Sequence, residues 1–259
     1  MQESMQSPKK IAVAGATGRV GHHVVDVLKA GGHDVVPMSR SLGVDVITGS
    51  GLAAALAGVE CVIDTATGPS PEEDSATAFF TTAARNLQEA GQRAGVRRMV
   101  AVSIIGVDRS TGGYGAAKLA HEQAVLAGPV PALVLRAAQF HEFVPVLVEW
   151  GTQGDVAYVP KMRTQLVAAR TVAETLAELA TAPGSRPSGP PFPEVAGPRE
   201  EILVEMATLL AERRGYPARV EAVNDPADRD RLNESGGLLP GPDAILAGPT
   251  FQEWLDLTY

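Results

Sequence analysis

Short apolar runs and longer amphipathic segments alternate through the first half of this chain. Residues 11–14 form a short apolar run, which predicts a buried strand. The next apolar side chains recur at i, i+4, i+7 and i+8, which predicts one face of a helix: Val20, Val24, Val27 and Leu28. This order of strand and helix repeats up to about Arg136. Such alternation is typical of an α/β fold, a doubly wound parallel sheet with helices on both faces.

The other elements follow from the same patterning. Strands are predicted at residues 33–40, 61–66, 99–103, 132–135, 193–196 and 219–223, and helices at residues 51–58, 71–90, 114–126, 171–179 and 199–214. The second of these helices has a start signal, with Ser70 as the cap, Pro71 at the first helical position and Glu73 three residues after the cap. Residues 183–193 read as a proline- and glycine-rich linker, and residues 224–248 as a polar, mobile segment.

Three glycines follow the first apolar run at intervals of three residues. Gly15 permits a tight turn, Gly18 lets backbone N–H groups approach an anion, and Gly21 lets the helix pack closely on the strand. The helix N-terminus adds free N–H groups and a partial positive charge. This arrangement predicts a site for the pyrophosphate of a dinucleotide. The alternative is a glycine-rich turn without a ligand, because 27 of the 259 residues are glycine.

The strand at residues 33–40 indicates which dinucleotide is bound. An NAD site usually has an acidic residue at the carboxyl end of this strand, whereas an NADP site has a basic one. Asp34 lies at the wrong end, and the carboxyl end carries Ser39 and Arg40, with Arg19 of the glycine turn as a second candidate. A guanidinium can hold a 2′-phosphate with a planar fork of donors. We therefore expect NADP(H), unless Arg40 is only a solvated surface residue.

A tyrosine and a lysine form the candidate catalytic pair. Tyr114 and Lys118 share one face of a predicted helix. A nearby ammonium lowers the pKa of a phenol, and the tyrosine can then give a proton to a carbonyl oxygen as hydride arrives. Ser103 could bond the same oxygen, and Lys118 could also hold the cofactor ribose; the alternative is a surface helix start with an incidental lysine. The residues expected to bind the cofactor are Gly15, Thr17, Gly18, Arg19, Val20, Gly21, Ser39, Arg40, Ala66, Thr67 and Lys118.

Composition narrows the class of protein. The formal net charge of −8 argues against non-specific binding to nucleic acid. The single Cys61 excludes an internal disulfide and reads as a buried small hydrophobe. We find no signal-peptide pattern at the polar start, no apolar run long enough for a membrane and no zinc-ligand spacing, so we expect a cytoplasmic protein with a small-molecule substrate and no bound metal. The oligomeric state is open.

Several motifs together resemble a known family. They are residues 15–21 (GATGRVG), Ser39-Arg40, residues 102–107 (VSIIGV) and residues 114–118 (YGAAK), with residues 135–140 and 195–201 further along. They look like the short-chain dehydrogenase/reductase superfamily, in its atypical, NmrA-like branch of NAD(P)H-binding proteins. The resemblance implies a Rossmann domain with a small C-terminal substrate region. It also implies that Ser103, Tyr114 and Lys118 match the catalytic positions of the superfamily.

This resemblance suggests a division into a polar tail at residues 1–8, a cofactor-binding core at residues 9–143 and a smaller substrate-binding region at residues 144–259, interleaved with the core. Side chains after the strand at residues 132–135 should arrive beside the nicotinamide. Gln139, Phe140, His141 and Phe143 could wall a pocket of mixed polarity there. Core packing is an equal expectation for the two phenylalanines, and His141 is more readily structural than catalytic.

The function expected from these features is NADPH-dependent reduction of a small carbonyl, quinone or related conjugated molecule. The branch also contains members that only bind or sense the cofactor, so a non-enzymatic, redox-sensing NADP(H)-binding regulator is the alternative. A third option is epimerisation or dehydration with a tightly held cofactor. Because Gly112, Gly113 and Gly115 flank Tyr114, the start of its helix is expected to be loose.

Overall fold

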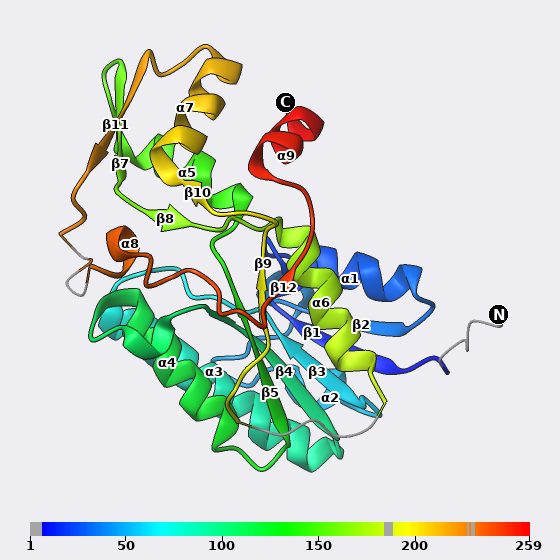
Figure 1. Cartoon of the computed structure of the whole chain (residues 1–259). Helices are drawn as coiled ribbons and strands as arrows, with labels where there is room; N and C mark the ends of the chain where they lie inside the picture. The colour runs from blue at the N-terminus through cyan, green and yellow to red at the C-terminus, as the bar shows by residue number, and fades with distance from the viewer. Residues whose placement is uncertain (1–6, 184–188, 227, 229–230) are drawn as a thin grey trace.

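The main sheet of the computed structural model is parallel throughout (Figure 1). The structure describes residues 7–183, 189–226, 228 and 231–259. Within these residues seven strands pair in the order β12-β9-β5-β4-β3-β1-β2. The predicted doubly wound Rossmann-type sheet is therefore confirmed. The strands are β1 (Lys10–Ala14), β2 (Asp34–Met38), β3 (Cys61–Asp64), β4 (Arg98–Ile104), β5 (Ala132–Ala137), β9 (Glu194–Ala196) and β12 (Ile245–Leu246).

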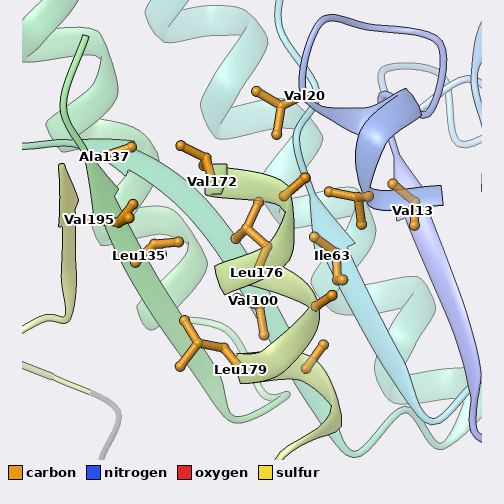
Figure 2. Close-up of a cluster of buried hydrophobic side chains, with 14 of the residues drawn as sticks. Val13, Val20, Ile63, Val100, Leu135, Ala137, Val172, Leu176, Leu179 and Val195 are labelled. Atoms are coloured by element: carbon orange, nitrogen blue, oxygen red, sulfur yellow. The ribbon is translucent and has the colours of Figure 1, made fainter. Parts of the chain in front are cut away.

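Helices cover both faces of this sheet and bury the apolar side chains of its central strands. One face packs against α1 (Gly21–Ala30) and α6 (Ala169–Thr181), and the other against α2 (Leu52–Ala55), α3 (Glu73–Ala94) and α4 (Gly113–Leu126). Figure 2 shows how α6 lies across the strands, with Leu176 and Leu179 directed toward side chains of β4 and β5. Cys61 is buried among these strands as expected, and burial raises the pKa of its thiol to about 12.

The chain after residue 143 builds a second, smaller cluster above the carboxyl ends of the strands and also returns to the main sheet (Figure 1). A three-stranded sheet pairs its strands in the order β11-β7-β6 among the described residues. Hydrophobic side chains of α5, α7 and α9 pack with β7 in one core. The elements are α5 (Val144–Gly151), β6 (Thr152–Gln153), β7 (Val156–Pro160), β8 (Arg163–Thr164), β10 (Glu201–Ile202), α7 (Leu203–Arg214), β11 (Arg219–Val223), α8 (Leu232–Ser235) and α9 (Phe251–Thr258), with short 3-10 turns η1 (Arg40–Leu42), η2 (Val107–Arg109) and η3 (His141–Phe143).

Two predicted helix starts are wrong. Ser70 does not cap α3: Glu72 is the cap, because its carboxylate accepts the Ser75 N–H at 3.1 Å, while the Ser70 hydroxyl accepts the Glu72 N–H at 3.2 Å. The predicted helix at residues 199–214 begins at Leu203, since Glu201 and Ile202 pair with β8 as the strand β10. In both cases a polar side chain or a strand partner takes up backbone groups that local sequence signals would give to the helix.

The start of α4 also differs from expectation. Gly113 has a φ of +65°, which favours glycine, and its N–H donates to the Glu73 carboxylate at 2.6 Å. The N-terminus of α4 is therefore tied to the start of α3 instead of being loose.

Parts of the predicted tail, linker and polar segment lie outside the described residues, namely residues 1–6, 184–188, 227 and 229–230. The described part of the polar segment contains α8 and β12. No helix among the described residues is both long and apolar enough to cross a membrane.

Candidate cofactor and catalytic site

The glycine turn between β1 and α1 is closely packed. Gly15 has a φ of +75°, and a Cβ there would lie 2.7 Å from the Thr65 carbonyl oxygen. A Cβ on Gly21 would lie only 2.1 Å from the Gly15 carbonyl oxygen, so α1 can approach the strand only without a side chain at this position. The Gly18 N–H donates to the Gly15 oxygen at 2.8 Å and closes the turn. The start of α1 has no side-chain cap, which suits an anion-binding turn.

The basic residues expected near the cofactor are on the surface. Arg40 opens the turn η1 after β2, and its side chain is exposed and forms no ion pair with any described residue. The Ser39 and Ser41 hydroxyls lie 2.9 Å apart beside it. Thr17 and Arg19 are exposed on the glycine turn. These polar groups are therefore available to a ligand.

The loop that follows β3 connects the glycine turn to the candidate catalytic tyrosine. Thr65 donates its hydroxyl to the Ala14 carbonyl at 2.7 Å, and its backbone oxygen packs on Gly15. Two residues later, the Thr67 and Tyr114 hydroxyls form a hydrogen bond of 3.4 Å. Tyr114, three strands away from the glycine turn in sequence, thus lies next to the loop that packs on that turn.

Burial, not a neighbouring ammonium, controls the ionisation of Tyr114. Its ring packs edge-on against Phe80, with ring centres 5.8 Å apart. Burial raises the pKa of Tyr114, and the bond to Thr67 lowers it by less. The prediction that Lys118 lowers this pKa is therefore wrong for this structure, and the reason is that the ammonium bonds elsewhere.

Lys118 belongs to a buried polar cluster beneath the carboxyl ends of β3 and β4. Its ammonium donates to the Val102 carbonyl at 2.8 Å and lies 2.9 Å from His121 Nδ1. His121 Nε2 lies 3.0 Å from Asp64 Oδ2, and the other Asp64 oxygen accepts the Ala66 N–H at 3.0 Å. Asp64 and His121 are each 1% exposed, and Lys118 is 5% exposed.

Opposing influences set the charges in this cluster. Burial lowers the pKa of Lys118 to about 8, although Asp64 and Glu122 oppose this. Burial also lowers the pKa of His121, followed in size by the nearby Lys118 ammonium. Burial alone would raise the pKa of Asp64, but its contacts with His121, the Ala66 N–H and Lys118 lower it overall. The pattern is a carboxylate, a neutral imidazole and an ammonium in a row.

Ser103 lies near the end of β4 and is buried, and its hydroxyl has no hydrogen-bond partner among the described residues. A buried hydroxyl without a partner is uncommon and marks a place where a further group can bond.

The four expected substrate-side residues have different surroundings. The Gln139 side chain accepts from the Thr164 hydroxyl at 2.7 Å, and Phe140 packs on the main core. Phe143 is half-buried and meets Trp150 edge-on, with ring centres 5.8 Å apart. The His141 ring is 0% exposed, so it packs inside the protein and does not face an open wall.

Sequence reasoning missed four polar residues of this region. Asp64 ends an apolar run, and His121 follows Lys118 by one helical turn, so both carried a weak signal. Thr65 and Glu142 carried none, because their contacts come from distant segments. The Glu142 carboxylate accepts the Ala169 N–H at 3.0 Å and bonds Trp254, and Arg19 lies near enough to influence its pKa.

A family model described as NAD(P)H-binding matches residues 15–183, which include the glycine turn, Arg40, Tyr114 and Lys118. The chain belongs to this NAD(P)H-binding family. The cofactor is therefore a nicotinamide dinucleotide, as expected from the glycine turn. No curated protein matches the sequence.

Solved structures share the fold at low sequence identity. MoeE5 with UDP-glucose and NAD has 19% identity and a TM-score of 0.68, over 95% of this chain and 96% of that one. The NADPH-dependent quinone oxidoreductase QOR2 of Escherichia coli, complexed with NADPH, has 19% identity and a TM-score of 0.66, over 95% and 99%. Triphenylmethane reductase of Citrobacter sp. with NADP(H) has 18% identity and a TM-score of 0.66, over 96% and 100%. At these identities the likenesses confirm the fold, which is the Rossmann-type α/β fold expected from the sequence.

Proposed function

We propose that this protein is an NADPH-dependent oxidoreductase that reduces a small carbonyl, quinone or related conjugated molecule. The observation that carries the proposal is the loop after β3. It packs on Gly15 through Thr65 and bonds the Tyr114 hydroxyl through Thr67. The same short loop therefore contacts both the Tyr114 hydroxyl, which can carry a proton, and the glycine turn expected to bind the pyrophosphate.

The residues present fit the dinucleotide. Gly15 and Gly21 have no room for a side chain and let the turn pack closely, and Gly18 carries no side chain that would cover the backbone facing the pyrophosphate. In the proposal Arg40, flanked by Ser39 and Ser41, holds a 2′-phosphate, and Arg19 and Thr17 contribute from the glycine turn. Ala66, Thr67 and Lys118 face the ribose and nicotinamide end.

The cofactor would supply the hydride, and the chain would supply the proton and the substrate contacts. Tyr114 holds a proton on its hydroxyl at neutral pH, because the pKa of a phenol is about 10 and burial raises that of Tyr114 further, so it can donate that proton to the substrate oxygen. Ser103 has a free hydroxyl to offer to the same oxygen. Gln139, Phe140 and Phe143 are proposed to line the substrate side, with His141 supporting them from behind.

The neighbours support this class without narrowing it to one substrate. Two reductases among them are described with NADPH or NADP(H), whereas MoeE5 is described with UDP-glucose and NAD. The preference for NADPH therefore rests on Arg40. An electron-poor quinone would ask less of Tyr114 than a simple ketone, since its carbonyl accepts hydride more readily.

The decisive experiment titrates the cofactor-free protein with NADPH and NADH by calorimetry, and then follows NADPH oxidation with a panel of quinones and aldehydes. Arg40→Ala should weaken NADPH by about 1.5–3 kcal/mol, which is the range for hydrogen bonds to charged groups, and should leave NADH unchanged. The exposed Arg97, at the opposite end of the sheet, provides the matched control Arg97→Ala. Equal affinities of wild type and Arg40→Ala for NADPH would refute the cofactor assignment.

The enzymatic step is tested on whichever substrate is turned over. Tyr114→Phe should lower kcat by about 10²-fold or more, the usual contribution of a positioned acid, while leaving NADPH affinity intact. Tyr216→Phe is the control, because the Tyr216 hydroxyl donates to the Gly154 carbonyl in the smaller cluster, away from Tyr114. Unchanged kcat in Tyr114→Phe would remove Tyr114 from the mechanism.

One observation favours a second function. The Lys118 ammonium donates hydrogen bonds to the Val102 carbonyl and to His121, and not to Tyr114. A protein that only binds NADP(H) and signals its redox state would not need an activated tyrosine. Tight binding that differs between NADPH and NADP⁺, with no turnover of the whole panel, would favour this sensor.

A further inference from the structure

We propose that His121 and Asp64 are positioning residues, which hold the Lys118 ammonium in one place and in its charged form at the carboxyl end of β4. The consequence for catalysis rests on the proposed function. The arrangement itself does not, because its hydrogen bonds are all made between groups of the protein.

The geometry fixes the direction of each hydrogen bond. An ammonium has only donors, so at 2.9 Å it must donate to His121 Nδ1. The imidazole then carries its proton on Nε2 and donates it to Asp64 Oδ2 at 3.0 Å. Asp64 in turn is oriented by the Ala66 N–H on its other oxygen. The donor and the acceptor of each hydrogen bond are therefore determined along the whole chain, from the Ala66 N–H in the loop after β3 to the Lys118 ammonium.

The surroundings make Asp64 the counter-charge of Lys118. The other nearby carboxylate, Glu122, forms a bidentate ion pair with Arg136, with N···O distances of 3.0 and 2.9 Å. Glu122 is thus already neutralised, whereas Asp64 meets no other described cation. The Phe80 ring covers a further side, 4.4 Å from the Lys118 nitrogen and stacked on His121. A buried ammonium enclosed in this way depends on a buried opposite charge.

The charged and titratable groups around the cluster come from every element packed on it: Asp64 from β3, Tyr114, His121 and Glu122 from α4, Glu73 from α3, Asp108 from η2 and Arg136 from β5. Among these, Asp64 and Glu122 favour the charged lysine. Since Arg136 offsets Glu122, loss of the Asp64 charge should have the greater effect on Lys118.

The proposal predicts how the lysine responds to pH. The pKa of Lys118 is about 8, so its ammonium is mostly present at neutral pH and is lost as pH rises. A protonated Lys118 can donate to ribose hydroxyls, and NADPH turnover should therefore decline above about pH 8. Without the Asp64 charge the lysine should lose its proton at lower pH, and the decline should move in the same direction.

The first test reads Lys118 directly, without cofactor or substrate. The chain has five lysines, so an NMR titration of lysine side-chain signals can resolve each of them, with Lys118→Met used for assignment. Asp64→Asn should raise the acid dissociation constant of Lys118 at least about tenfold, since it removes one nearby charge but keeps a hydrogen-bond acceptor for His121. Glu122→Gln is the matched control and should change that constant less. An unchanged Lys118 titration in Asp64→Asn, or an equal change in both variants, would overturn the proposal.

A second measurement needs no variant and covers the case in which Asp64→Asn does not fold. The ring nitrogens of His121 in the wild-type protein should show the proton on Nε2 and none on Nδ1 at neutral pH. A proton on Nδ1 would contradict the bond from Lys118 and overturn the proposal.

A third comparison separates the two bonds of His121. In His121→Asn the amide oxygen stands close to the place of Nδ1, so Lys118 keeps an acceptor while Asp64 loses its donor. In His121→Gln the amide nitrogen stands close to the place of Nε2, so Asp64 keeps a donor.

If the proposed function also holds, the pH profile of NADPH turnover should move to lower pH in Asp64→Asn. Failure of turnover alone would count against the proposed function and not against the positioning role, because the NMR titration is independent of turnover.

Discussion

The glycine turn and the contact between η3 and α9 are held together in different ways. At the glycine turn, Gly15 and Gly21 meet each other across six residues, and their partners from a distant segment are the adjacent Thr65 and Ala66. In the second region, the His141 imidazole donates to the Pro249 carbonyl at 3.1 Å, 108 residues away in sequence. Its ring stacks on Trp254 at 5.5 Å and contacts Phe251.

The two regions also differ in how their polar groups are used. The glycine turn leaves the Thr17 and Arg19 side chains exposed, where a ligand can reach them. The α9 contact buries its polar atoms, and two of them, His141 Nδ1 and Glu201 Oε2, have no partner among the described residues. The turn should therefore be sensitive to added volume, and the α9 contact to added charge.

Added volume at the glycine turn should have the largest effect. In Gly21→Ala the new Cβ would lie 2.1 Å from the Gly15 carbonyl oxygen and 2.8 Å from the Thr65 hydroxyl. The backbones of Gly15 and Gly21 cannot move apart without a shift of β1 or α1. We expect the free energy of unfolding to fall by about 3 kcal/mol, the upper part of the range for overpacking, and NADPH affinity to fall more than about tenfold. Urea unfolding and calorimetric titration measure the two effects.

Gly91→Ala is the control for this prediction. Gly91 is a buried glycine of α3 whose added Cβ would meet Val130 at 3.4 Å, an ordinary contact. This variant should be neutral or slightly more stable, because alanine is the better helix former. If both variants behave alike, the contrast between the close turn and ordinary packing is mistaken.

The same contrast between local and distant contacts separates the features that the sequence predicts from those that it does not. The glycine turn, β2 with its basic end and α1 could be predicted because a few neighbouring residues determine them. The direction of Lys118 could not, since spacing places it on the same helix face as Tyr114 but cannot show that His121 and Val102 take its hydrogens. A side chain one turn further along the same helix and a backbone carbonyl of β4 decided between two arrangements that satisfy the same pattern.

The C-terminal region illustrates the same limit. The helix α9 was not predicted, although Thr250 and Glu253 form a capping box. Its stability as an element depends on Phe251 and Leu255 being buried against α7 and η3, and no local pattern reports that. The predicted start of α7 is wrong for a similar reason: Glu201 and Ile202 pair with β8 as a strand.

Added charge at His141 should have the next largest effect. Burial lowers the pKa of His141 from 6.5 to about 4, so the folded protein resists protonation that the unfolded chain accepts. Stability from this residue is fully present above about pH 6.5 and is lost as pH falls toward 4. The linkage relation gives a loss of about 2 kcal/mol between pH 7 and pH 5. Urea unfolding at a series of pH values measures it.

His141→Phe removes the titration while keeping a ring against Trp254. The variant should be about 1 kcal/mol less stable at pH 7, because the bond to Pro249 is gone. It should match or exceed the wild type at pH 5, so that the two stability curves cross. Parallel curves would show that His141 is not the group that makes this end sensitive to acid.

The smallest predicted effect concerns the cap of α9. Thr250 accepts the Glu253 N–H at 3.3 Å, and the Glu253 carboxylate accepts the Thr250 N–H at 2.8 Å. Thr250→Ala should lower the free energy of unfolding by about 1 kcal/mol, the usual contribution of a capping hydroxyl, and Thr250→Ser should restore most of it. Hydrogen exchange shows where the loss occurs: amides of α9 should exchange faster while those of α1 keep their protection, because the close contacts of the glycine turn are made with Thr65 and Ala66. Equal acceleration in both helices would mean that the two regions unfold as one unit, and the difference between them would then lie in their chemistry alone.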